Sequence, residues 1–186
     1  MNKVIGLFAG SLRKESFSRK IAKAVAAMAP AGFEFKIISL DDLPLYNQDF
    51  DDENQVPQSY TIFRNEVKAI NGAIFITPEY NRSVPAVLKN ALDVGSRPYG
   101  KSVWDGKPGA VFSNSPGSIS GFGANHHLRQ SLVFLNVPVM QQPEVYLTKV
   151  NELFDEHGNI QKEEIKEFLQ KAVDAYIVWF NKSSSQ

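Results

Sequence analysis

The chain has 186 residues, 43% of them hydrophobic, which is enough for one domain with a sizeable buried core and too few for two comfortable domains. Lysine plus arginine and aspartate plus glutamate number 20 each, and this balance argues against a protein that binds nucleic acid or an anionic membrane through a basic face. Cysteine is absent, which excludes disulfides, thiolate metal ligands and a cysteine nucleophile. The sequence shows neither a signal peptide nor a membrane-spanning run, so we expect a cytoplasmic protein.

Apolar runs alternate with amphipathic segments along almost the whole chain. The first run, residues 3–9, is nearly continuous, which is typical of a strand buried on both faces of a parallel sheet. In residues 58–69, the spacing predicts a helix with Ile62, Val67 and the following Ile70 facing inward. We expect strands at 3–9, 33–40, 73–77, 110–113 and 138–146, the last irregular because of Pro143, and helices at 18–29, 58–69, 86–94, 124–135 and 160–180.

This alternation predicts an α/β fold, a flavodoxin-like three-layer sandwich with a five-stranded parallel sheet in the order 2-1-3-4-5. No internal repeat or linker divides the chain, so we expect residues 1–186 to form a single domain with 181–186 as a frayed tail. In such sheets the ligand lies at the carboxyl ends of the strands, beside the switch point. The loops that would meet there are 10–18, 78–85 and 114–123.

The loop after the first strand, GSLRKESFSRK at 10–20, combines a glycine with three serines and four basic residues. Hydroxyls, a guanidinium and the free N–H groups of a helix start are the groups that bind a phosphate dianion. The loop matches neither a Walker A sequence nor a Gly-x-Gly-x-x-Gly turn. The alternative is a solvated loop in which Ser18 only caps the helix.

The loop after the third strand, PEYNRSVP at 78–85, carries Tyr80 and Asn81 between two prolines. The tyrosine offers a flat surface for an aromatic ring, and the asparagine and nearby N–H groups suit ring nitrogens and carbonyls. The prolines stiffen both ends and lower the cost of holding the loop ready. The alternative is a plain turn with a surface tyrosine.

Together these motifs resemble the NAD(P)H-dependent FMN reductases, and most closely their bacterial quinone and chromate reductase branch. The motifs are GSLRKESFS after the first strand, PEYNRSVPAVLKNALD after the third and a Ser/Gly-rich loop after the fourth. The first motif is moderately specific and the second strongly so, and they stand in the family's order. The resemblance continues through HLRQSLVFLNVPVMQQPE, so it covers nearly the whole chain.

The resemblance implies FMN as cofactor and NADH or NADPH as co-substrate, with hydride transfer to the flavin N5 and no catalytic side chain or metal. It implies a ping-pong reaction with quinones and other small-molecule acceptors such as chromate, azo compounds or free flavin. It also implies a homodimer or homotetramer. The residues carried over are Ser11, Arg13, Ser16, Phe17 and Ser18 for the phosphate, Pro78, Glu79, Tyr80 and Asn81 for the isoalloxazine, and Ser113, Asn114 and Ser115 for its other side.

Several residues near these loops have two interpretations. Glu79 is read as a hydrogen-bond organiser in preference to a general base, and His126 and His127 as helix-surface residues. Tyr99 and Trp104 are read either as a lid over the ring or as packing between subunits. Four basic residues also have two interpretations. One is a basic mouth that binds pyridine-nucleotide phosphates or an anionic oxidant, and the other is scattered surface charge. The residues are Arg82, Arg97, Lys101 and Arg129. The acidic stretch 41–52 lacks the pattern of a calcium loop and is read as solvated.

Three rival functions remain open from the sequence. A flavodoxin-like electron carrier without NAD(P)H turnover shares the fold and FMN, but carriers usually have a strongly acidic docking surface and this chain is neutral. A non-catalytic module that binds a phosphate ligand is the second. A hydrolase is weaker because Gly-x-Ser-x-Gly is absent.

Overall fold

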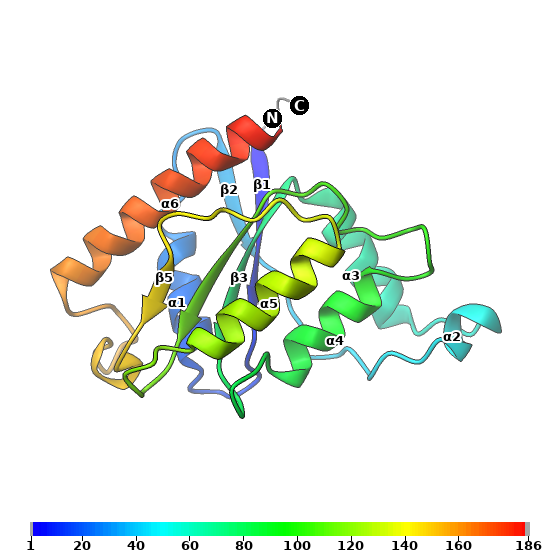
Figure 1. Cartoon of the computed structure of the whole chain (residues 1–186), viewed down its shortest axis with the longest axis horizontal. Helices are drawn as coiled ribbons and strands as arrows, with labels where there is room; N and C mark the ends of the chain where they lie inside the picture. Colours follow the sequence, from blue (N-terminus) through cyan, green and yellow to red (C-terminus); the bar gives the residue numbers. More distant parts are fainter. Residues whose placement is uncertain (1, 185–186) are drawn as a thin grey trace.

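Residues 2–184 are described by the structure, a computed structural model, and they contain a five-stranded parallel sheet (Figure 1). The strand order is β2-β1-β3-β4-β5, which confirms the predicted topology. Ile5 of β1 pairs with Phe35 of β2 on one side and with Gly72 of β3 on the other, so β1 lies between these two strands. The strands are β1 (Lys3–Ala9), β2 (Phe33–Ile37), β3 (Gly72–Pro78), β4 (Gly109–Asn114) and β5 (Val145–Leu147).

Helices cover both faces of this sheet and complete the three layers (Figure 1). One apolar core joins the first and last helices to the sheet, and a second core joins the three middle helices to the opposite face. None of the helices among residues 2–184 is long and apolar enough to cross a membrane. The helices are α1 (Phe17–Ala26), α2 (Asp49–Asp52), α3 (Gln58–Ala69), α4 (Ala86–Gly95), α5 (Phe122–Phe134) and α6 (Glu163–Ser183), with a 3-10 turn η1 (Val150–Glu152).

Trp104 lies in the second core and not at the surface. Its ring is fully buried, its centroid is 5.2 Å from that of Phe8, and its Nε1 donates a hydrogen bond to the Leu92 carbonyl at 3.1 Å. A Cβ on Gly95 would come within 2.4 Å of the indole nitrogen, so the glycine makes room for the ring. The expectation of a lid or a subunit contact is therefore wrong for Trp104, whereas Tyr99 is highly exposed.

The elements differ from the sequence-based expectation in several places. Residues 138–144 contain two prolines that cannot donate to a sheet ladder, so β5 begins only at Val145. A four-residue helix, α2, forms inside the acidic stretch 41–52. In α3, Tyr60 and Phe63 occupy the inward face with Val67, and Ile62 is half exposed. Residues 181–183, expected in a frayed tail, continue α6, and 185–186 lie outside the described residues.

Candidate functional site

The carboxyl ends of β1, β3 and β4 lie at the lower edge of the sheet in Figure 1. The three loops that follow them surround a cavity of about 180 Å³. Ten of the twelve residues predicted from the sequence line this cavity, and Asn81 and Ser113 do not. Pro116 also lines it and was not predicted, although its position next to Ser115 was a usable signal. The lining residues are Ser11, Arg13, Ser16, Phe17, Ser18, Pro78, Glu79, Tyr80, Asn114, Ser115 and Pro116.

Ser113 points away from the cavity into the protein. Its hydroxyl is fully buried, donates to the Val145 carbonyl at 3.4 Å and accepts from the Asn125 amide at 3.2 Å. Successive side chains on a strand point to opposite faces, so Ser113 and Asn114 at the end of β4 cannot both face one cavity. The expectation that Ser113 lines a ligand site is therefore wrong in this structure.

Asn81 occupies the tip of a tight hairpin. The backbones of Tyr80 and Ser83 exchange two hydrogen bonds, of 3.2 and 2.9 Å, across the two residues between them. Those residues, Asn81 and Arg82, have φ angles of 49° and 64°, as in the turns that close two-residue hairpins. Asparagine tolerates this left-handed backbone better than most residues do. Its side chain is exposed at the tip and does not line the cavity.

Glu79 fastens this hairpin to the start of α5. Its Oε2 accepts a hydrogen bond from the Ala124 N–H at 3.0 Å, and its Oε1 pairs with Arg82 at 3.2 Å. A carboxylate is favourable there because the N-terminus of a helix carries partial positive charge. A Cβ on Gly123 would lie 2.6 Å from the Arg82 carbonyl, so glycine allows the close approach. These contacts support the organiser interpretation of Glu79.

The bases of the first loop have different partners. Arg19 braces the loop, because its Nε donates to the Ser11 carbonyl at 3.1 Å and its guanidinium pairs with Asp41. Lys20 pairs with Glu15 at 2.8 Å, and this contact lowers the pKa of the Glu15 carboxyl. Arg13 lines the cavity and, among residues 2–184, has no carboxylate within ion-pair distance.

The donors around Arg13 suit an anion. The hydroxyls of Ser11 and Ser18 are buried at the cavity wall, and the Ser16 hydroxyl caps α1 by accepting from the Arg19 N–H at 3.2 Å. The N–H groups of Phe17 and Ser18 begin α1 and have no acceptor within residues 2–184. A guanidinium, hydroxyls and free helix N–H groups form a donor set that fits a phosphate monoester such as the tail of FMN.

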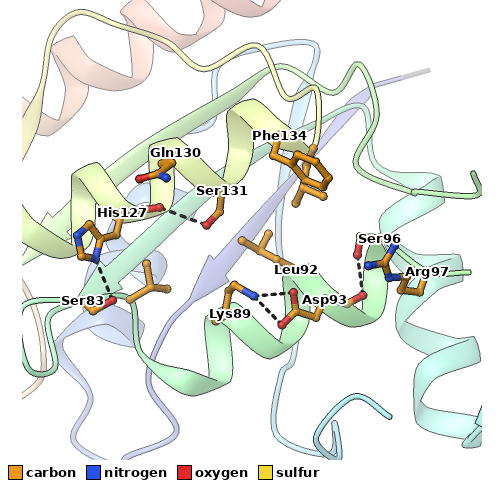
Figure 2. Close-up of a pocket in the computed structure, with 12 residues that line it drawn as sticks. Ser83, Lys89, Leu92, Asp93, Ser96, Arg97, His127, Gln130, Ser131 and Phe134 are labelled. Atoms are coloured by element: carbon orange, nitrogen blue, oxygen red, sulfur yellow. Dashed lines mark hydrogen bonds and ion pairs between the residues drawn. The ribbon is translucent and has the colours of Figure 1, made fainter. Parts of the chain in front are cut away.

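A larger, open groove of about 620 Å³ lies between α4 and α5 (Figure 2). In Figure 2, Lys89 pairs with Asp93 at 2.7 Å on one side of it, and the His127 Nδ1 lies 3.0 Å from the Ser83 hydroxyl on the other. Phe134 stands on its rim with 82% of its surface exposed. The groove therefore borders the hairpin at Ser83, whereas the smaller cavity borders it at Tyr80.

The four basic residues considered for a mouth are not gathered in one cluster. Arg82 pairs with Glu79, and Arg129 donates to the Asn125 side chain and the Met140 carbonyl at 2.8 and 2.9 Å. Arg97 lies on the groove of Figure 2, where Lys101 is not among the lining residues. The scattered-charge interpretation fits this arrangement better.

The two adjacent histidines lie on the exposed face of α5, as expected. His126 is 3.2 Å from the Tyr146 hydroxyl and packs on Phe122, with ring centroids 4.2 Å apart. Burial and the Glu144 carboxylate, which accepts from the same hydroxyl at 3.0 Å, raise the pKa of Tyr146 to about 12. Tyr146 is therefore protonated at neutral pH. Within residues 2–184, no group of histidines and carboxylates is arranged to hold a metal ion.

Comparison with known proteins identifies the family. The family model of the NADPH-dependent FMN reductases matches residues 3–152. A quinone reductase of Pseudomonas putida is 51% identical over 175 residues, which cover 94% of this chain and 93% of that protein. A 2-hydroxy-1,4-benzoquinone reductase of a Burkholderia species is 42% identical over 94% of each chain.

A solved structure agrees with this assignment. The flavoenzyme NAD(P)H:(acceptor) oxidoreductase FerB of Paracoccus denitrificans superimposes with a TM-score of 0.89 at 36% identity, covering 97% of this chain and 98% of that one. The sheet order and the positions of the loops thus have a counterpart in a flavoenzyme of the same size. The chain belongs to the NADPH-dependent FMN reductase family, whose members are oxidoreductases that use FMN with NAD(P)H as electron donor.

Proposed function

We propose that this protein transfers electrons from NADH or NADPH to quinones, with FMN held in the cavity at the ends of β1, β3 and β4. The observation that carries the proposal is the convergence there of buried serine hydroxyls with Arg13 and the first N–H groups of α1, which have no ion-pair or hydrogen-bond partner among residues 2–184. The names of the two similar reductases, both of quinones, support the choice of acceptor.

Each part of the site has a separate task in this proposal. Arg13 and the hydroxyls of Ser11 and Ser18 bind the phosphate, and Tyr80 offers its ring, about half exposed, beside the isoalloxazine. Glu79 keeps the hairpin in place through α5, so the loop is ready before the cofactor arrives. When bound, FMN supplies the chemistry: it accepts hydride from NAD(P)H and passes two electrons to the acceptor.

The range of acceptors follows from the openness of the site. Tyr80 is at the surface with about half of its area exposed, so acceptors of different shape have access to this side of the site. We include chromate, azo compounds and free flavin as further acceptors beside quinones. The nicotinamide and the acceptor would use the same face in turn, which is a ping-pong order.

Initial-rate kinetics test this proposal. Rates of NADH and NADPH oxidation by the purified holoprotein are measured over a grid of benzoquinone concentrations, and then with chromate, an azo dye and free FMN. The proposal predicts parallel double-reciprocal lines, because the two substrates never occupy the site together. Intersecting lines would contradict the ping-pong order, and absence of turnover would favour the electron carrier.

The groove between α4 and α5 is our proposed contact with a second copy of the chain. Phe134 lines the groove with 82% of its surface exposed, and its neighbour in the sequence, Val133, is 73% exposed. A projecting apolar residue and a hollow on one face can pair reciprocally across a two-fold axis. We therefore propose a homodimer through this face, which could pair again into a homotetramer.

A further inference from the structure

Asn114 links the three segments that form the cavity wall, β4, α1 and β3, through hydrogen bonds of its buried side chain. It is the last residue of β4, and its side chain is 2% exposed. Its amide nitrogen donates to the Ser18 hydroxyl oxygen at 3.0 Å and to the Thr77 carbonyl at 3.2 Å. A carbonyl oxygen can only accept, so the contact with Thr77 requires that the NH₂ end of the amide faces both partners.

This arrangement determines the role of the Ser18 hydroxyl. A hydroxyl has one proton to donate and lone pairs to accept with. Because Asn114 donates to the oxygen, the Ser18 proton must go to another acceptor, and none lies within hydrogen-bond distance among residues 2–184. Ser18 lines the cavity beside Arg13 and the free N–H groups of α1. The proton is therefore available to a ligand in that cavity.

We propose that Asn114 is a positioning residue for the phosphate of FMN, which acts by holding the Ser18 hydroxyl as a donor toward that phosphate. The inference rests on the proposed function, because it takes FMN as the ligand of this cavity. It assigns Asn114 a role through Ser18, where the sequence suggested a direct contact with the flavin. Without the Asn114 amide, no donor orients the Ser18 hydroxyl, so its proton is free to rotate away from the phosphate.

The test compares FMN with riboflavin, which has the same ring and lacks the phosphate. Dissociation constants of both are measured for the apoprotein by quenching of flavin fluorescence, in the wild type, Asn114→Ala, Ser18→Ala and the double variant. We expect each single variant to weaken FMN binding about fivefold to tenfold while riboflavin binding stays unchanged. The double variant should bind FMN no more weakly than Ser18→Ala, because both substitutions remove the same hydrogen bond.

Asn125→Ala is the matched control. Asn125 is another buried asparagine whose amide donates to a serine hydroxyl at the end of β4, that of Ser113, but neither residue lines the cavity. This variant should retain the wild-type ratio of FMN to riboflavin affinity. If Asn114→Ala does not fold, Asn114→Ser, which is too short to reach both partners, replaces it.

Three results would overturn the inference. Equal losses of FMN and riboflavin affinity in Asn114→Ala, or additive losses in the double variant, would show that Asn114 does not act through the Ser18 hydroxyl. In those cases wild-type FMN binding, and with it the proposed function, would stand. If the wild type bound riboflavin as tightly as FMN, the phosphate site would be rejected together with this inference.

Discussion

Arg13 is the single side chain on which the phosphate assignment depends most. The other arginine of the loop, Arg19, is committed to Asp41, whereas Arg13 faces the cavity without a carboxylate partner within residues 2–184. Arg13→Ala should weaken FMN binding by about 1.5–3 kcal/mol, the contribution of a hydrogen bond to a charged group. Titration of the apoprotein with FMN measures it.

The control for this prediction is Lys14→Ala. Lys14 is the exposed neighbour of Arg13 and does not line the cavity, so its removal changes the net charge equally without removing a contact. FMN affinity should change little in that variant. An FMN dissociation constant in Arg13→Ala equal to the wild-type value would remove Arg13 from the phosphate site.

At the scale of single residues, the sequence predicted which loops form the cavity better than which side chains face it. The grouping of serines and arginine at 11–18 was visible, because hydroxyls and bases are unusual together in a connector. The orientation of Ser113 was not visible, since it depends on the phase of the β4 pleat and on a partner 12 positions away, Asn125. Asn81 was expected in the site and lies outside the cavity lining for a similar reason, because the hairpin places it at the exposed tip.

At the scale of secondary-structure elements, the contact between the hairpin and the start of α5 depends on Glu79. Replacing Glu79 with alanine removes the acceptor for the Ala124 N–H and the partner of Arg82. The free energy of unfolding should fall by about 1 kcal/mol, as when a helix cap is lost. Chemical denaturation measures this change.

Glu79→Gln separates the charge from the hydrogen bond. Glutamine retains an oxygen for the Ala124 N–H but loses the charge that attracts the helix N-terminus and pairs with Arg82, so it should cost less than alanine. FMN binding should weaken more in the alanine variant, because the hairpin loses its attachment. Equal stability of Glu79→Ala and the wild type would show that the contact does not organise the loop.

The short helix α2 is held by a buried ion pair. Arg64 on α3 contacts both carboxylate oxygens of Asp51 at 2.8 Å, and the two side chains are only 11% and 4% exposed. These hydrogen bonds from Arg64 lower the pKa of the Asp51 carboxyl. The acidic stretch 41–52, read as solvated from its composition, is thus partly fixed by a cation that is distant in sequence.

The pH dependence of stability follows from this lowered pKa. In the unfolded chain, the pKa of Asp51 is near the reference value of about 3.9. Above that pH the ion pair therefore contributes fully to the free energy of unfolding. Its contribution is lost as the pH falls from there through the lower pKa of the folded state. Asp51→Asn should therefore cost on the order of 3 kcal/mol at pH 7 and progressively less below about pH 4. Urea unfolding of both proteins at several pH values measures this difference, and a constant difference down to pH 2 would contradict the account.

Most elements could be predicted because local patterns determine them. The limits of α3 and β1 follow from apolar periodicity and from prolines and glycines at their ends, and the structure reproduces both ranges. The late start of β5 and the formation of α2 could not be predicted in the same way. They depend on contacts between distant parts of the chain, namely the pairing of β5 with β4 and the ion pair of Arg64 with Asp51.

For the molecule as a whole, the proposed contact between copies gives a direct prediction. Phe134→Glu places a charge on the rim of the groove between α4 and α5, where Phe134 is now exposed (Figure 2). A charge buried without a partner is costly, so the oligomer should dissociate. Light scattering coupled to size-exclusion chromatography measures the mass.

Val178→Glu provides the comparison for that experiment. Val178 is also exposed, but it lies on α6, which covers the other face of the sheet (Figure 1). The same charge should leave the oligomer intact there. An unchanged mass in Phe134→Glu would place the subunit contact elsewhere.

The strand order 2-1-3-4-5 was predictable from the sequence because right-handed crossovers leave few ways to arrange alternating strands and helices. That order also brings residues as distant as Ser18 and Asn114 to one edge of the sheet. The donors of three loops therefore form one site only in the folded chain, which is why its individual hydrogen bonds could not be predicted from the sequence.

The most direct test of the account is an anaerobic absorption titration of the purified protein. The account predicts bound FMN, bleaching of its visible absorption by one equivalent of NADPH or NADH, and full recovery on addition of one equivalent of benzoquinone. A protein that takes up no FMN, or whose bound flavin is reduced by dithionite and not by either nicotinamide, would contradict it.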